Sequence, residues 1–242
     1  MIISHKYKII FIHICKNAGT FITYFLKNLD ENIEYLGDYH NNCKYGKEVL
    51  DPEIWNNYTK FCVIRNSWDF TLSLYTYIKL CEDHHLYNLV KNLSFEEYLL
   101  SDDIDICITR NLSQTYFIMD DYDNIMVDYM INFDCLNTSL VHFFKEIIKI
   151  DLETIMEALP RNKINKSDKE YNYKLYYNNK TIELVSKIHE KDIVFLNFKY
   201  DVELTDDKIK NDDVIVETDD KIKNDNIVKA IDIISQEYYK NI

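Results

Sequence analysis

A run of apolar residues near the start of the sequence, KYKIIFIHI (Lys6 to Ile14), is rich in β-branched side chains. This pattern is typical of a strand in a parallel sheet that is covered on both faces, because a half-exposed strand alternates apolar and polar residues. The run stops at CKNAGT. Apolar residues then recur at helical spacing, at Phe21, Tyr24, Phe25 and Leu29. The segment is therefore predicted to fold as a strand, a short loop and a helix.

The same order of elements occurs a second time. KFCVIR (Lys60 to Arg65) is another candidate for a buried strand, and it also runs into a helix. Asn66 or Ser67 can cap the free amides at the start of that helix. The side chains that share one face of it are Trp68, Leu72, Tyr75 and Leu80.

The rest of the chain continues this alternation. Residues 85–121 are predicted to be mostly helical, with Ser94 before FEEYLL as a capping box. NIMVDYMINF is a third extended run, Ser139 to Lys149 an amphipathic helix, and Lys180 to His189 a further helix, followed by the apolar run DIVFLNFKY. Apolar strands that alternate with amphipathic helices imply an α/β fold with a parallel, right-handed sheet.

The length of 242 residues favours one α/β domain with a small appendage. After Tyr200 the character of the sequence changes. TDDKIKND occurs at Thr205 and again at Thr218, and residues 201–242 carry twelve acidic and six basic side chains. Two copies of so short a unit are too few for a solenoid. We predict a domain over residues 1–200 and a solvated acidic tail over 201–242, with a helix at Asn226 to Tyr239.

The formal net charge is −13, which argues against a general nucleic-acid binder, because such proteins need clustered basic residues. The apolar runs are far shorter than the roughly 20 residues of a membrane span. Six cysteines occur without a C-x-x-C pair, as is usual for free thiols in a reducing compartment. We therefore expect a soluble protein of the cytoplasm.

The first loop combines several features of an anion site. Lys16, Asn17, Ala18, Gly19 and Thr20 lie between a predicted buried strand and a helix start, where free amides and the helix dipole favour an anion. The lysine adds positive charge, the glycine allows close approach of the backbone, and the threonine offers a hydroxyl. The loop is thus predicted to hold a phosphate. The alternative is an ordinary turn with a solvated lysine.

The loop HICKNAGTF resembles the 5′-phosphosulfate-binding loop of sulfotransferases, which use 3′-phosphoadenosine 5′-phosphosulfate (PAPS) as donor. It is most similar to the branch that modifies carbohydrate hydroxyls, whose loop typically reads His-Ile-Pro-Lys-Thr-Ala-Gly-Thr-Ser. Cys15 stands where that branch has proline, and Phe21 where it has serine. The resemblance implies a P-loop-like three-layer sandwich with a central parallel sheet flanked by helices. It also implies a donor site that runs from Lys16 to Phe21.

A second motif, VIRNSWDFTLSLYTY, looks like the family's Arg-Asn-Pro-Trp-Asp-Arg followed by a serine and a tyrosine. The resemblance implies that Arg65 and Ser73 bind the 3′-phosphate of PAPS. Ser67 replaces a proline of the family motif and Phe70 an arginine. Taken alone, Arg65 could instead pair with Asp69, and the tryptophan of the motif could belong to the core.

The resemblance covers residues 6–200. NLSQTYFI and VDYMINFDCL look like a family stretch that ends in Phe-Glu-Asn-Leu, with Asp134 at the place of the glutamate. LPRNKINKSDKEYNYKLYY resembles the family's C-terminal segment. By that resemblance Asn165, Lys166 and Ser167 lie close to PAPS. The alternative is that Lys163 and Lys166 are solvated residues of an ordinary loop.

Transfer of a sulfuryl group to a sugar hydroxyl needs a general base and stabilisation of the leaving phosphate. Lys16 suits the second role. His40, between the two motifs, is the candidate base, and Asp38 is the reserve candidate. His13 is expected to be structural. No metal is expected, because the adjacent pair HH at 84–85 points to two faces of a helix and has no third ligand.

The leading hypothesis is a PAPS-dependent sulfotransferase that acts on a hydroxyl acceptor, a carbohydrate, with no nucleic-acid partner and no membrane span. Two alternatives stay open. A phosphotransferase of the P-loop class would need a Gly-Lys-Ser/Thr ending, which the loop lacks. A non-catalytic nucleotide-binding relic of the same fold is suggested by Phe21, Ser67 and Phe70.

Overall fold

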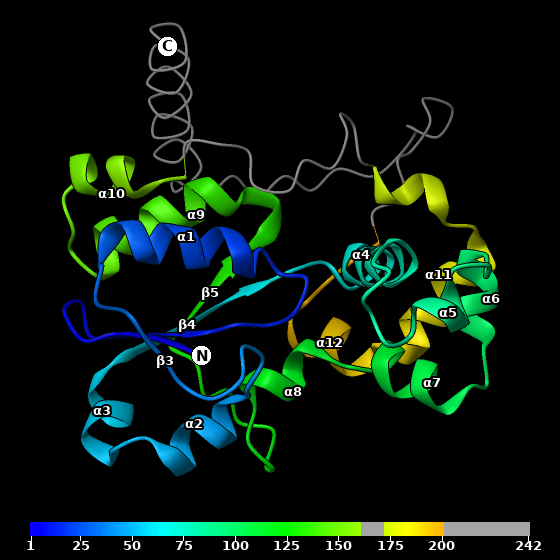
Figure 1. Cartoon of the computed structure of the whole chain (residues 1–242), viewed down its shortest axis with the longest axis horizontal. Coiled ribbons are helices and arrows are strands. Elements are labelled where there is room, and N and C mark those ends of the chain that lie inside the picture. Colours follow the sequence, from blue (N-terminus) through cyan, green and yellow to red (C-terminus); the bar gives the residue numbers. More distant parts are fainter. Residues whose placement is uncertain (161–171, 201–242) are drawn as a thin grey trace, which may run out of the picture. The chain divides into compact units, whose positions relative to one another are not determined.

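The chain forms a mixed α/β fold around a five-stranded sheet (Figure 1). The computed structural model describes residues 1–160 and 172–200, all within the compact unit Met1–Tyr200. The strands are β1 (Ile2–Ser4), β2 (Ile9–Ile12), β3 (Glu34–Tyr35), β4 (Thr59–Ile64) and β5 (Tyr129–Asn132), in the order β3-β1-β2-β4-β5. Strands β2, β4 and β5 are parallel, as predicted.

The prediction of an entirely parallel sheet is wrong at β1. This strand pairs antiparallel with both β2 and β3, so the sheet is mixed. The reason is local: residues 5–8 form a turn, with Lys8 at φ 52°, that folds β1 back on β2 so that Ile2 faces Phe11. Strands joined by so short a turn must be antiparallel, because a parallel pair needs a long crossover.

Helices cover both faces of the sheet, which explains why β2 is apolar throughout (Figure 1). One face carries α2 (Cys43–Val49), α3 (Pro52–Asn57) and α8 (Gln114–Ile118). There Ile10, Ile12 and Cys62 pack in one core with Trp55 and Phe117. The other face carries α1 (Gly19–Leu29), α9 (Leu136–His142) and α10 (Leu152–Ala158).

Aromatic rings fill the core under this second group of helices. The ring of Phe61 lies 5.1 Å from that of Phe11 and 4.8 Å from that of Phe143, and Phe25 of α1 lies 4.8 Å from Phe144. These pairs join two strands to α1 and to the π-helical turn η2 (Phe143–Ile147) that follows α9. The predicted helix over 139–149 is thus α9 with this turn.

A helical region extends from the sheet at α4 (Ser67–Leu80). It contains α5 (Tyr87–Val90), α6 (Phe95–Leu100), α7 (Ile104–Arg110), the 3-10 turn η3 (Tyr173–Tyr176) and α11 (Asn179–Ile188), and α12 (Glu190–Phe195) follows (Figure 1). Trp68, Leu72 and Val185 belong to its core. Trp68 is therefore a core residue here, and its Nε1 donates to the carbonyl of Ile182 at 3.2 Å.

Several local predictions are confirmed. Asn66 caps α4, Ser94 forms a capping box with Glu97, and α11 occupies the predicted helix over 180–189. Two residues differ from expectation. Tyr24 is exposed because Ile22, Phe25 and Leu29 make the buried face of α1, and Leu80 is exposed because it is the last residue of α4.

DIVFLNFKY is not a strand: it begins within the short helix α12. The acidic tail over 201–242, including the expected helix, lies outside the described residues, as do Asn165, Lys166 and Ser167.

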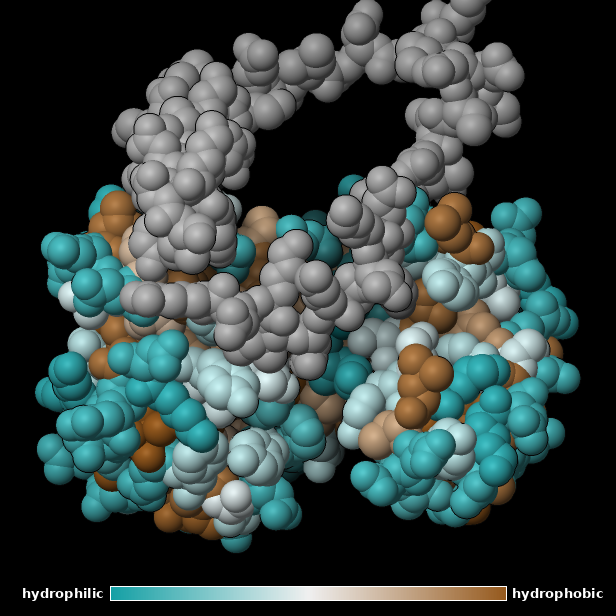
Figure 2. All heavy atoms as spheres, turned by 45° about the horizontal axis from the view of Figure 1, so that its top comes forward, coloured by the Kyte–Doolittle hydropathy of each residue, from teal (hydrophilic) through white to brown (hydrophobic). Residues whose placement is uncertain are grey.

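All six cysteines are unpaired, as expected, and Cys135 is the exposed one. In the part of the chain that the structure describes, no helix has both the length and the apolar character needed to cross a membrane. Most of the surface seen in Figure 2 is hydrophilic, with hydrophobic side chains in small separate groups.

Candidate anion-binding site

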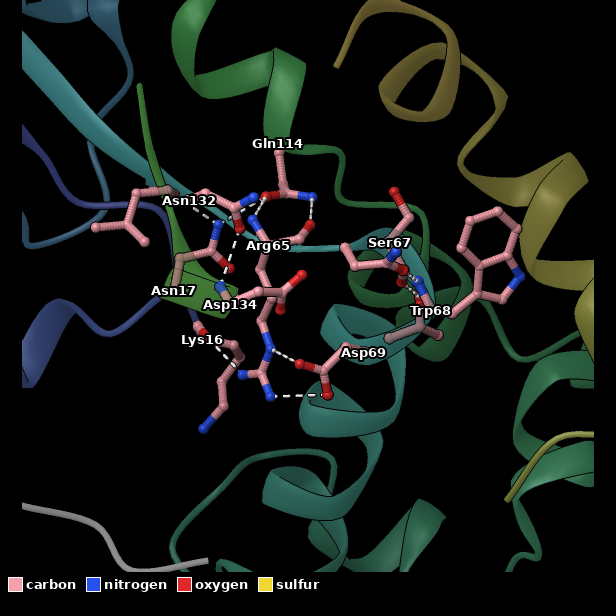
Figure 3. Close-up of polar contacts among 12 residues, drawn as sticks. Lys16, Asn17, Arg65, Ser67, Trp68, Asp69, Gln114, Asn132 and Asp134 are labelled. Carbon is pink, nitrogen blue, oxygen red and sulfur yellow. Dashed lines mark hydrogen bonds and ion pairs between the residues drawn. The ribbon is translucent and has the colours of Figure 1, made fainter. Parts of the chain in front are cut away.

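Both sequence motifs lie at the carboxyl edge of the parallel strands. Because β2, β4 and β5 run in the same direction, the loop 13–18, residues 65–66 and the 3-10 turn η1 (Phe133–Cys135) are neighbours (Figure 3). Strand β3 runs in the direction of β2, since both are antiparallel to β1, so the segment 36–42 begins at this edge too. Ligands of open α/β sheets bind at this edge.

The loop leaves the first amides of α1 without a side-chain cap. Lys16 and Ala18 have left-handed backbones, with φ of 60° and 54°, and Ala18 occupies the cap position. Within residues 1–160 and 172–200, three helices have ten or more residues, and the other two are capped by Asn66 and Asn178. The start of α1 therefore presents the positive end of its dipole without an internal acceptor.

Gly19 is constrained by a neighbour that the sequence did not reveal. A Cβ at this position would lie 1.5 Å from Nε2 of His13, because the imidazole packs against the first residue of α1. The absence of a side chain is thus needed for histidine packing, in addition to any role toward a ligand. Thr20 is exposed in the first turn and Phe21 is half-buried.

Asn17 anchors the loop to the sheet. It is 1% exposed, and its Nδ2 donates to the carbonyl of Val63 at 2.8 Å and to Oε1 of Gln114 at 2.7 Å. Gln114 also bonds both backbone groups of Arg65, accepting from N at 2.9 Å and donating to O at 2.7 Å (Figure 3). Asn17 was predicted to bind the donor, but its amide group is used inside the protein.

Asp192 of α12 completes this connection. Its carboxylate accepts from the backbone amides of Gln114 and Thr115 at 2.7 and 2.9 Å, and from the Thr115 hydroxyl at 2.7 Å. Neither Gln114 nor Asp192 was predicted from the sequence to belong to the site. No local signal could have found them, because their partners are distant in sequence.

Arg65 forms a buried ion pair, so the alternative considered from the sequence is confirmed. Its Nε and Nη2 donate to the two carboxylate oxygens of Asp69 at 2.6 and 2.9 Å, and Nη1 donates to the carbonyl of Lys16 at 2.9 Å. The guanidinium lies 4.0 Å from the centre of the Phe133 ring. Arg65 thus fixes the loop, while Asp69 offsets its charge.

The ammonium of Lys16 has a different environment. It lies 3.9 Å from the centre of the Tyr77 ring, and no side chain among the described residues forms an ion pair or hydrogen bond with it. Burial lowers its pKa, and the charge of Arg65 lowers it further. Lys16 is therefore a half-buried cation whose charge no anion among the described residues offsets, and a bound anion would stabilise it.

Ser73 belongs to the same face of α4. Asp69, Ser73 and Tyr77 follow one another at intervals of four residues, which places them on one stripe of a helix. Asp69 contacts Arg65 and Tyr77 contacts Lys16, so Ser73 is on the stripe of α4 between these two contacts. Of the predicted donor-binding residues, Lys16 and Arg65 are in direct contact, and helical spacing places Ser73 on the side of α4 that faces them.

His40 lies beside His13, with ring centres 4.5 Å apart. Its Nδ1 is 3.0 Å from the carbonyl oxygen of His13. A carbonyl only accepts, so Nδ1 carries the hydrogen, and Nε2 is the ring nitrogen left to accept a proton in the neutral tautomer, as a general base requires. No hydrogen bond or ring contact within the described ranges joins His40 to Lys16 or Arg65. Asp38 accepts from the Met1 amine through its backbone carbonyl at 3.2 Å.

His13 is mostly buried, and its Nδ1 has no hydrogen-bond partner in the described part of the chain. Burial lowers the pKa of His13 to about 3, with smaller contributions from His40 and the terminal amine.

Burial likewise lowers the pKa of His84, with His85 and Lys16 adding to the effect. Across the described ranges, no group of three His, Cys, Asp or Glu side chains is arranged to hold a metal.

Comparison with known proteins gave no match to a family model, to a curated protein or to a solved structure.

Proposed function

We propose that this protein is a sulfotransferase that moves a sulfuryl group from PAPS to a hydroxyl of a carbohydrate acceptor. The proposal includes a P-loop-like arrangement of the sheet and its helices. The observation that carries it is the uncapped start of α1 next to the Lys16 ammonium, which has no anionic partner among the described residues. Both features stabilise bound phosphate or sulfate oxygens.

The two cations would have different roles toward the donor. Lys16 supplies net positive charge, because Asp69 offsets the charge of Arg65. Arg65 would donate hydrogen bonds from those guanidinium N–H groups that do not bind Asp69. Ser73 would contribute a hydroxyl from the facing turn of α4. This division suits a donor with a reacting 5′-phosphosulfate at Lys16 and a second phosphate that needs only to be positioned.

His40 would act on the acceptor. Its Nε2 takes the proton of the acceptor hydroxyl, whose oxygen forms a bond to sulfur while the bond from sulfur to the bridging oxygen of the 5′-phosphate breaks. Lys16 stabilises the negative charge that develops on that oxygen. The products are a sulfate ester and 3′-phosphoadenosine 5′-phosphate.

The binding test compares this product nucleotide with ATP and magnesium in thermal-shift and calorimetric titrations. We expect the product nucleotide to bind, and Lys16→Met to weaken its binding at least about tenfold, since a charged hydrogen bond contributes roughly 1.5–3 kcal/mol. Lys44→Met is the matched control, because Lys44 forms an exposed pair with Asp121. Binding of ATP with magnesium and not of the product nucleotide would favour the phosphotransferase instead.

The turnover test follows transfer of labelled sulfate from PAPS to a panel of glycans. His40→Ala should lower kcat by roughly 10²–10⁴, the usual effect of a general base, while nucleotide affinity stays unchanged. The Arg65–Asp69 pair favours a second candidate, a nucleotide-binding relic, because it already satisfies part of the guanidinium. Nucleotide binding without any turnover would support the relic.

A further inference from the structure

Three exposed tyrosines lie near the pair of His13 and His40. The ring of Tyr39 lies 6.2 Å from that of His13 and 5.8 Å from that of Tyr35, both edge to face. Tyr24, Tyr35 and Tyr39 are 49%, 40% and 59% exposed. We call these three residues the tyrosine face. It extends from the candidate base across the outer side of α1 and β3.

Lys27 of α1 joins the members of the tyrosine face. Its ammonium lies 5.6 Å from the centre of the Tyr35 ring. A hydrogen bond to Tyr35 raises the pKa of Lys27, and the hydroxyls of Tyr39 and Tyr24 add smaller effects in the same direction. Tyr24 lies one helical turn before Lys27 on α1, and the Tyr35 ring of β3 contacts the same ammonium, so Lys27 links α1 to β3 within this face.

Such a surface has the chemistry of a binding site for an elongated, amphipathic molecule. A single exposed aromatic ring is common on any protein, but a contiguous group marks an interaction surface. Tyrosine loses little side-chain entropy when it binds and offers both an apolar ring and a polar hydroxyl. All three rings are at least 40% exposed, whereas small apolar ligands are usually held in enclosed pockets.

Charge limits which molecules can occupy it. Residues 24–40 contain one lysine, Lys27, and three exposed acidic residues, Glu31, Glu34 and Asp38, while Asp30 is buried. This excess of negative charge repels a polyanion. A neutral sugar chain is uncharged and amphipathic, as this surface requires, because pyranose rings present apolar C–H faces to aromatic rings and hydroxyls to polar groups.

We propose that the tyrosine face binds the acceptor as an uncharged oligosaccharide, several sugar units long, and directs one end of it to His40. This inference rests on the proposed function for the identity of the reaction. It adds that the acceptor is neutral and that Tyr39 and Tyr35 determine specificity. Tyr39 is the most informative residue, because its ring touches both His13 and Tyr35.

The test titrates the full chain, saturated with 3′-phosphoadenosine 5′-phosphate, with cellohexaose, chitohexaose and a heparin hexasaccharide by calorimetry. We expect binding of a neutral hexasaccharide and weaker or no binding of heparin. Tyr39→Ala should weaken the affinity for the neutral hexasaccharide roughly tenfold, as loss of a central tyrosine does at binding surfaces. Tyr39→Phe keeps the ring, so its affinity for the hexasaccharide should stay within about threefold of that of the parent protein. Tyr122→Ala, at a tyrosine that is 86% exposed, is the control.

Three outcomes overturn the inference: no binding of either neutral hexasaccharide, tighter binding of heparin, or an unchanged affinity in Tyr39→Ala. Thermal melting of each variant shows whether it is folded. Failure of the nucleotide to bind would count against the proposed function. The saccharide titration, repeated without nucleotide, would still measure the tyrosine face independently.

Discussion

Replacement of His13 by phenylalanine should make the protein less sensitive to acid. The imidazole is mostly buried against Gly19 and stacks on Phe11, with ring centres 5.6 Å apart. Its Nδ1 has no partner among the described residues, so a carbon at that position loses no hydrogen bond there. His13→Phe therefore keeps the packing of a ring and removes the titrating group.

The size of the effect follows from the pKa of His13, which burial lowers from 6.5 to about 3. The unfolded chain then takes up the proton first, so stability falls as the pH drops below about 6.5 and continues to fall until about pH 3. Between pH 7 and pH 5 this single group costs about 2 kcal/mol of unfolding free energy. The neighbouring His40 and the Met1 amine are present in both proteins.

Urea denaturation at pH 7 and pH 5 measures this difference. The parent protein should lose about 2 kcal/mol more than His13→Phe over this interval. Tyr39→Phe is the matched control, since Tyr39 also contacts the His13 ring but the substitution leaves the imidazole in place. An equal loss of stability in the parent and His13→Phe would refute the reasoning, because burial of His13 would then not govern its protonation.

Two further substitutions test the packing of the loop. Gly19→Ala should destabilise the protein by about 1–3 kcal/mol, because the new methyl group collides with the His13 imidazole, and the double variant with His13→Ala should recover part of the melting temperature. Asp192→Asn should cost about 1–3 kcal/mol in urea denaturation, because an amide accepts less well from the backbone of Gln114 and Thr115. Nucleotide affinity should fall in the same variant, and an unchanged affinity would show that the loop does not depend on α12.

The strands at the centre of the sheet could be predicted because their composition reflects their surroundings. β2 and β4 are covered on both faces, so nearly every residue is apolar. β1 could not be predicted in the same way. It has only three residues, and its direction depends on the turn with Lys8 in a left-handed conformation, which the sequence does not mark with a glycine.

The candidate site was predictable where its chemistry follows the chain. Lys16 lies in a loop just before a helix, and the Arg65–Asp69 pair has the four-residue spacing of a helical turn. The connections that hold the loop have no such spacing. Gln114 bonds a residue 97 positions earlier, and Asp192 bonds one 78 positions earlier. Such contacts follow from the tertiary fold and not from a local pattern.

The exposed thiol of Cys135 offers a way to observe the site directly. Burial raises the pKa of Cys15 to about 11 and that of Cys43 to about 12, so these thiols react slowly with alkylating reagents at neutral pH. Cys135 ends the turn that carries Phe133, whose ring lies against Arg65. A fluorophore attached there would stand two residues from this contact. Its emission could then follow ligand arrival at Arg65 in a stopped-flow experiment, once the partly buried Cys81 and Cys107 are replaced by serine.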